Sequence, residues 1–187
     1  MSGKELSAGD VSSCIEHQPD DRPTASDERF ERLLRDADRR VRAVVFRMVG
    51  TDVDDVLQVA YVKAYRGWSS FEGRSLPSTW LHSIAVNAAL DHLRARGRAA
   101  DHRAGMSPAD GQVDDPAERV ASAIDLDAAL QQLPVDRRVV VLLVDGQGFS
   151  HTDAAVVLGV PAGTVASRLS RARHELRGLL EGERHGR

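Results

Sequence analysis

Residues 150–173 read SHTDAAVVLGVPAGTVASRLSRAR, and their spacing predicts two short helices joined by a tight turn. The small side chain of Ala155 lets the two helices approach closely, and Gly159 can adopt the positive φ that the turn requires. Val165 lies where an apolar side chain fills the angle between the helices. This pattern is typical of a helix-turn-helix, whose second helix enters the major groove of DNA.

The second helix of this pair also carries a polar and basic face. Arg168 has the fork geometry for a bidentate contact with guanine, whereas Thr164 and Arg171 are better placed for phosphate. An ordinary helical hairpin with a solvated basic face is the alternative interpretation. The side chains that we predict to contact duplex DNA are Thr164, Ser167, Arg168, Arg171 and Arg173.

Helical periodicity extends to both sides of this segment. Apolar residues recur at intervals of three and four, and polar turn residues separate the periodic segments. We expect Thr51 or Asp52 to cap the second helix and Ser78 to cap the third. The run Val139–Val144 has strand propensity, but its helical neighbours favour a buried helix. The expected helices cover about residues 30–49, 53–67, 79–96, 117–133, 136–144, 150–158 and 162–180.

Segments without apolar periodicity divide the chain. Residues 1–28 are acidic and polar, which predicts a disordered tail, and residues 99–116 are rich in Gly, Pro and Asp, which predicts a flexible linker. The helical segments 29–98 and 117–182 then form two separate units. The predicted fold class is therefore all-α: two small helical domains joined by a flexible linker, the C-terminal one a helix-turn-helix.

Composition excludes several other classes of protein. With 42% hydrophobic and 28% charged residues and a net charge of −3, the 187-residue chain suits a soluble globular protein. The single cysteine, Cys14, excludes an intramolecular disulfide framework, and the lone pair Cys14 and His17 is too few ligands for a zinc site. The sequence shows no membrane span or signal pattern, so we expect a cytoplasmic protein with no membrane insertion.

Several motifs together resemble one known family. The segments QLPVDRRVVVLL from Gln132 and LGVPAGTVASRLSRAR from Leu158 are similar to the domain of extracytoplasmic-function sigma factors that recognises the promoter −35 element. The segment DVDDVLQVAYVKAYR from Asp52 resembles their core-polymerase-binding helix. The segment STWLHSIAVNAALDHLR from Ser78 resembles their −10 helix. The likeness covers about residues 28–182, in the family's order.

This resemblance implies roles for residues of the first domain. The acidic and amide side chains that would meet core polymerase are Asp54, Asp55 and Gln58. Carboxylates at the N-terminus of a helix also stabilise the helix through its dipole, so a purely structural role is the alternative. The loop 71–78 would capture a base extruded from the melting promoter. Trp80 is equally consistent with a core anchor. The residues implied in −10 binding are Phe71, Ser75, Trp80, Asn87, Arg94 and Arg96.

The resemblance also implies partners. They are core RNA polymerase through its beta-prime and beta subunits, promoter DNA and an anti-sigma factor, with no cofactor, no metal and no catalytic residue. Domain 29–98 would bind polymerase and melt the −10 element, while domain 117–182 would hold the −35 element. The chain departs from the family's usual pattern at Val59, where an acidic residue is usual, and at Ala166, where a lysine is usual.

Two other classes compete with this hypothesis. A conventional helix-turn-helix regulator would bind duplex DNA without polymerase, but the helix of Asp54 and the helix of Trp80 do not fit it. An enzyme is disfavoured, because His82 and His92 are not spaced as a ligand pair and His151 with Asp153 lacks a nucleophile. The expected function is promoter-specific transcription initiation.

Overall fold

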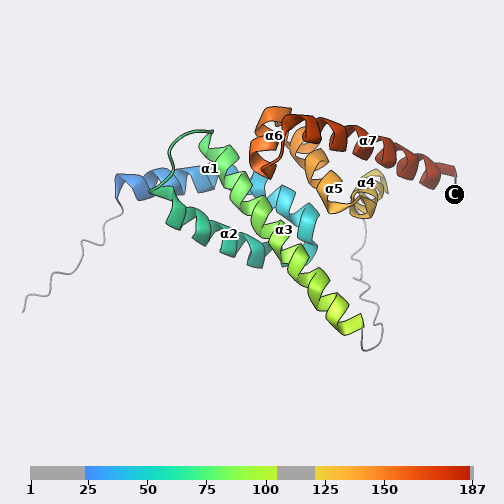
Figure 1. The fold of residues 1–187 in the computed structure, drawn as a ribbon, viewed down its shortest axis with the longest axis horizontal. Coiled ribbons are helices and arrows are strands. Elements are labelled where there is room, and N and C mark those ends of the chain that lie inside the picture. Colours follow the sequence, from blue (N-terminus) through green and yellow to red (C-terminus); the bar gives the residue numbers. More distant parts are fainter. Residues whose placement is uncertain (1–23, 105–120, 186–187) are drawn as a thin grey trace, which may run out of the picture.

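The computed structural model describes residues 24–104 and 121–185, and these residues form helices without any strand. One helical unit comprises α1 to α3, and a second comprises α4 to α7, as Figure 1 shows. This confirms the all-α fold class. The predicted tail up to residue 23, with Cys14, and the predicted linker from residue 105 lie outside the described residues. The elements are α1 (Ala25–Val49), η1 (Gly50–Asp52), α2 (Val53–Trp68), α3 (Pro77–Ala104), α4 (Ala121–Gln132), α5 (Val135–Val141), η2 (Leu142–Gly146), α6 (His151–Leu158) and α7 (Ala162–His185).

Helix α1 begins earlier than the sequence suggested. The predicted tail ran to residue 28, but a capping box starts the helix at Ala25. The Thr24 hydroxyl accepts a hydrogen bond from the backbone N–H of Asp27, and the Asp27 carboxylate accepts one from the backbone N–H of Thr24. Because these bonds satisfy orphan N–H groups of the first turn, acidic residues expected in a tail belong to a helix.

Two expected caps are wrong. Neither Thr51 nor Asp52 caps α2 through its side chain, since both lie in the short 3-10 turn η1 and no side-chain cap bond is made. Ser78 lies inside α3, which begins with Pro77, a residue whose fixed φ and missing N–H suit the first helical position. Helix α3 also continues to Ala104, past the predicted linker start at residue 99, because its alanines favour helix.

The first unit is held together by aliphatic side chains. Val41 and Val45 of α1, Ala60 of α2, and Leu81 and Ala85 of α3 are fully buried. The small residues let the three helices pack closely. Figure 1 shows α3 crossing both α1 and α2.

The helix expected over 136–144 is present, as α5 followed by the π-helical turn η2, and its residues Val139–Leu143 are buried. The same helix carries a buried arginine. Arg138, 9% exposed, donates hydrogen bonds to the backbone oxygens of Gln131 and Leu133 at 2.7 and 3.1 Å. These oxygens lie at the end of α4, where carbonyls lack helical partners. Arg138 therefore joins α5 to the C-terminus of α4.

The two units pack against each other along α3 and α6 (Figure 1). The ring of His82 in α3 meets the ring of Phe149, just before α6, edge-on at 4.9 Å between centroids. Arg40 Nε donates to Gln147 Oε1 at 3.1 Å, and Arg47 Nε lies 3.1 Å from the Asp127 carboxylate. An aromatic contact, a hydrogen bond and an ion pair thus join the two units.

Candidate nucleic-acid and polymerase interfaces

Helices α6 and α7 form the predicted helix-turn-helix. Ser150 caps α6 by accepting a hydrogen bond from the backbone N–H of Asp153 at 3.0 Å. Gly159 ends the helix in the left-handed region with φ +63°, as the turn requires. Val165 at the start of α7 is fully buried and fills the angle between the helices. The local pattern in the sequence therefore located this motif correctly.

Three of the five residues that we predict to contact duplex DNA are exposed or half-buried and make no ion pair in the described structure. Ser167 and Arg171 are exposed, and Thr164 is half-buried. The Ser167 hydroxyl donates to the Thr164 carbonyl at 3.0 Å, which leaves its oxygen free to accept. These side chains occupy the first turns of α7, the part that enters the major groove in such motifs.

The other two predicted contacts are held by carboxylates. Arg168 Nε lies 3.3 Å from an Asp136 oxygen, and its side chain is only 30% exposed. Arg173 makes a two-pronged contact with Asp145, with Nε at 3.0 Å, and this hydrogen bond raises the pKa of the guanidinium. Both arginines are thus paired with carboxylates of the segment formed by α5 and η2.

The loop between α2 and α3 lies beside a cluster of aromatic rings. Phe71 stacks on Trp68 with 9° between the rings and 5.5 Å between centroids. Trp80 meets Phe71 at 5.1 Å and Trp68 at 5.9 Å, and it remains half-buried. Both alternatives for Trp80 thus have support, because its ring is part of the packing and also borders the loop. Ser75, in the loop, is half-buried as well.

The remaining −10 candidates lie farther along α3. Asn87 is exposed two turns beyond Trp80 and does not join the loop cluster. Arg94 pairs with Asp91 at 2.9 Å and Arg96 with Asp52 at 2.6 Å. Hydrogen bonds from His92 and then Arg96 lower the pKa of the Asp52 carboxyl. Asp52 therefore ties α3 to the start of α2 instead of capping α2.

The candidate polymerase face lies on the first turns of α2. Asp55 and Gln58 are exposed, and the Asp54 carboxylate accepts a 2.6 Å hydrogen bond from Arg42 of α1. Two apolar side chains that sequence reasoning did not assign extend this face: Val59 is 51% exposed and Val62 is 45% exposed. In the sequence, Val59 is recognisable only as a departure from the family pattern. Val59 thus adds exposed apolar surface directly after Gln58 on the same helix.

Sequence reasoning also missed the contact between the units. His82 was considered only as a metal ligand, yet its ring is 2% exposed and its Nδ1 lies 2.8 Å from the Ser78 carbonyl. Burial lowers the pKa of His82, and the positive charge of Arg40 acts in the same direction. Within the described ranges, no cluster of His, Cys, Asp and Glu could hold a metal ion, and no helix is long and apolar enough to cross a bilayer.

Comparison with known proteins identifies the family. The family model of Sigma-70 region 2 matches residues 33–99, and that of Sigma-70 region 4 matches residues 123–176. The ECF RNA polymerase sigma factor SigM of Mycobacterium tuberculosis is 42% identical over 156 residues, which are 83% of this chain and 77% of SigM. The chain belongs to the ECF sigma factors. As a member of this family, it is an alternative sigma factor that directs transcription initiation.

Further relatives of this sigma factor extend the likeness to three dimensions. The ECF RNA polymerase sigma-E factor of Escherichia coli K12 is 33% identical over 165 residues, covering 79% of this chain and 84% of that one. The sigma factor RpoE of Bartonella quintana, solved with the anti-sigma factor NepR, superposes with a TM-score of 0.71 at 29% identity, over 82% of this chain and 98% of RpoE. The expected family and fold are thereby confirmed.

Proposed function

We propose that this sigma factor uses its two helical units for different tasks at the promoter. The first unit binds core polymerase through α2 and holds the melted −10 element at the loop before α3. The second unit holds the −35 element as duplex through α7. The observation that carries this division is the pairing of a helix-turn-helix in one unit with a partly exposed aromatic cluster in the other.

The aromatic cluster suits single strands and the helix-turn-helix suits duplex. Every base offers a face that can stack on an aromatic ring, so Phe71 is a suitable partner for an unpaired base. Arg168 and Arg171 on α7 carry the guanidinium groups that duplex recognition uses for base edges and phosphates. The polymerase contact would involve Asp55 and Gln58, with Val59 adding an apolar contact where the family usually has an acidic one.

An anti-sigma factor is the further partner that we propose. The structures of RpoE from Bartonella quintana and of CnrH are both complexes, with the anti-sigma factor NepR and with the cytosolic domain of CnrY. CnrH superposes with a TM-score of 0.60 at 25% identity. These likenesses support an anti-sigma factor as an inhibitor of this chain.

Run-off transcription with purified core polymerase and a promoter library tests the proposed function. Specific initiation is expected only when this chain is added. A chain that shifts duplex DNA alone, yet never directs specific initiation, would be a conventional regulator and would contradict the proposal.

The tasks of the two units are separated by variants. Arg168→Ala should weaken −35 recognition by roughly 1–3 kcal/mol and leave polymerase binding intact. Arg177→Ala, at an exposed arginine nine residues farther along α7, is the control for the lost charge. Asp55→Ala with Gln58→Ala should weaken polymerase binding, and Glu31→Ala on α1 controls for the lost charge. Unchanged promoter choice in Arg168→Ala would remove Arg168 from the recognition group.

A further inference from the structure

A cavity of about 380 Å³ lies between the two units, with α3 on one side and α5, α6 and α7 on the other. It adjoins the place where α3 and α6 pack together (Figure 1). This volume falls within the range of small-ligand pockets, which occur preferentially where two domains meet. We call it the inter-unit cavity.

The walls of the inter-unit cavity are mainly aliphatic. Val139 is buried in the second unit, whereas the other five aliphatic side chains stay half-buried although the units are packed together. Protein interiors are normally as dense as organic crystals, so apolar surface that is half-covered at a contact lacks some of its dispersion contacts. An apolar ligand would supply them. The six side chains are Leu90, Leu93, Val135, Val139, Leu158 and Val160.

The charged residues of the cavity, Arg94, Arg168 and Asp136, leave one positive charge in excess. Arg168 Nε lies 3.3 Å from the Asp136 carboxylate, and the Arg168 side chain is only 30% exposed. Among the residues that the structure describes, Asp136 is its only ion-pair partner, and its terminal nitrogens make no hydrogen bond. A mostly covered guanidinium with unused donors favours a carboxylate, which can accept two parallel hydrogen bonds from it.

Arg94 can reach the same carboxylate at little cost. Its NH1 lies 2.9 Å from Asp91, and the two side chains are 63% and 64% exposed. Exposed pairs of this kind contribute little to stability, so Arg94 can turn toward an anion in the cavity. A ligand held by Arg94 and Arg168 at once would connect the first unit to the second.

The volume of the cavity limits the size of the ligand. A water molecule occupies about 30 Å³ in the liquid, and a carbon or oxygen atom of a ligand needs a similar volume. The cavity therefore has room for about a dozen such atoms. A saturated carboxylate of medium chain length, such as decanoate, matches this size, the aliphatic walls and the single positive charge.

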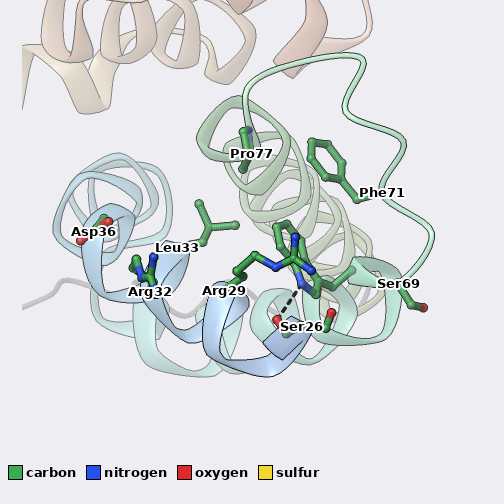
Figure 2. A pocket seen from close by; sticks show the side chains of 9 residues that line it. Ser26, Arg29, Arg32, Leu33, Asp36, Ser69, Phe71 and Pro77 are labelled. Atoms are coloured by element: carbon green, nitrogen blue, oxygen red, sulfur yellow. Dashed lines mark hydrogen bonds between the residues drawn. The ribbon is translucent and has the colours of Figure 1, made fainter. Parts of the chain in front are cut away.

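The cavity between α1 and the loop before α3 is of a different kind (Figure 2). Arg29 and Arg32 also border it, but its walls include the stacked rings of Trp68 and Phe71. All of its lining residues belong to the first unit, and the loop is part of the proposed −10 site. A ligand there could not join the units, so this second cavity is a control for the first.

We propose that the inter-unit cavity binds a small saturated carboxylate, with its chain on the aliphatic walls and its carboxylate on Arg168 and Arg94. Because the ligand touches both units, it binds their packed arrangement and stabilises it. It also occupies two arginines that we propose for promoter DNA, so the ligand and the promoter compete. The binding does not depend on the proposed function, whereas this competition rests on it.

The first test is calorimetric titration of the full chain with decanoate, below the concentration at which decanoate forms micelles. Saturable binding of one decanoate per chain is expected. Arg168→Gln should weaken it by about tenfold, because a hydrogen-bonded charge pair is lost. Arg177→Gln, at an exposed arginine of α7 outside the cavity, should bind as the wild type does. Equal losses in both variants, or no saturable binding by the wild type, would overturn the proposal.

A second set of variants locates the ligand. Val160→Phe, and independently Leu93→Phe, adds a ring to the inter-unit cavity and should abolish decanoate binding while circular dichroism shows wild-type helix content. Arg29→Ala with Arg32→Ala alters the other cavity and should leave the affinity unchanged. Binding that survives both phenylalanine variants and is lost in the arginine double variant would place the ligand beside the loop and contradict the proposal.

A third comparison tests whether the ligand touches both units and needs its charge. Arg94→Gln on α3 should weaken decanoate binding several-fold, whereas Arg98→Gln, at an exposed arginine of the same helix outside the cavity, should not. Decan-1-ol has the same chain without the charge and should bind about tenfold more weakly. An Arg94→Gln protein with wild-type affinity would show that the second unit binds the ligand alone. Equal affinity for decan-1-ol would show an apolar site without a carboxylate partner.

Competition with DNA is measured by fluorescence anisotropy on a promoter duplex that the chain recognises. Saturating decanoate should weaken duplex binding several-fold in the wild type and have no effect in the Val160→Phe protein. Decan-1-ol at the same concentration should have much less effect. Unchanged duplex affinity of the wild type at saturating decanoate would contradict the competition.

Failure of this inference differs from failure of the proposed function. If the chain never directs initiation, the proposed function is wrong, and calorimetry with decanoate still tests the cavity. If initiation is normal and decanoate does not bind, only the cavity assignment is wrong.

Discussion

The two helical units differ in how they use aromatic residues. Seven of the eight aromatic side chains lie between residues 30 and 80, in the first unit, and five of them touch one another at one end of it. The second unit has only Phe149, and that ring packs against His82 of the first unit. The second unit is therefore built from aliphatic side chains and uses charge at its surface.

This difference matches the two kinds of DNA at a promoter. Stacking surface is useful only where bases are unpaired, because the faces of paired bases are covered by their neighbours. Duplex offers groove edges and phosphates, which call for hydrogen-bonding and charged groups on a helix. A sigma factor that meets both states of DNA needs both kinds of surface.

The contact between the units brings together arginines that we propose for different promoter elements. Arg94 of α3 and Arg168 of α7 line one cavity of about 380 Å³, which also includes Leu90, Leu93 and Leu158. Residues assigned to different promoter elements thus face each other across the closed contact. We expect the units to separate when both elements are bound.

The largest expected effect comes from the aliphatic core of the second unit. Leu169→Ala, at a side chain that is 2% exposed, should cost about 2–5 kcal/mol. Both tryptophans lie in the first unit, so fluorescence follows that unit while circular dichroism follows all helices. Urea unfolding should show helix loss before the fluorescence change. Coincident curves would mean that the two units unfold as one.

A smaller loss is expected at the buried arginine. Arg138→Met keeps the apolar stem and removes the hydrogen bonds to Gln131 and Leu133, which should cost about 2–3 kcal/mol. Arg171→Met is the control, because that side chain is exposed. Equal unfolding midpoints for the two variants would show that the cap of α4 contributes nothing.

The single aromatic residue of the second unit gives the next effect. Phe149→Ala removes the ring that meets His82 and should weaken the contact between units by about 0.5–1.5 kcal/mol. Small-angle X-ray scattering should show a larger radius of gyration. Val156→Ala, at a 53% exposed position on α6, should leave the radius unchanged. An unchanged radius of gyration in Phe149→Ala would mean that other contacts hold the units together, such as the hydrogen bond between Arg40 and Gln147.

Acid should weaken the same contact through His82. Burial lowers the pKa of this imidazole from 6.5 while the units are packed, so below that pH the separated state binds more protons than the packed one. The contribution of neutral His82 to packing is fully present above about pH 6.5 and is lost as the pH falls below it. Scattering curves across this range should show expansion. His82→Leu should abolish the response, whereas the exposed His151→Gln should retain it.

The smallest effect concerns the carboxylate that holds Arg168. Asp136→Asn removes the charge of a pair that is partly exposed on both sides, worth at most about 1 kcal/mol. Affinity for −35 duplex should rise by less than tenfold, measured by fluorescence anisotropy. The same change at Asp153 of α6, whose carboxylate accepts a hydrogen bond from the Ser150 hydroxyl, is the control. A fall in affinity would indicate that Asp136 itself contacts DNA.

Local patterns predicted most of the helices and the helix-turn-helix. Gly159 and Val165 could be assigned because a left-handed turn and a buried corner each depend on a few adjacent residues. Helix starts were less predictable: Asp27 was assigned to a tail and Ser78 to a cap, because carboxylates and hydroxyls have similar propensities in both settings. The helical state of Val139–Val144 followed from its neighbours rather than from its own composition.

The candidate site also divides into features that are predictable from local sequence and features that are not. The fold class, the family and the candidate DNA-binding helix could be predicted from residue types and their order, since periodicity and motif spacing are properties of neighbouring residues. Only the folded chain placed Arg29 and Arg32 beside Phe71, paired Arg168 with Asp136, and set His82 against Phe149. These contacts join residues from separate helices, and their proximity depends on how the helices pack, which no local period encodes.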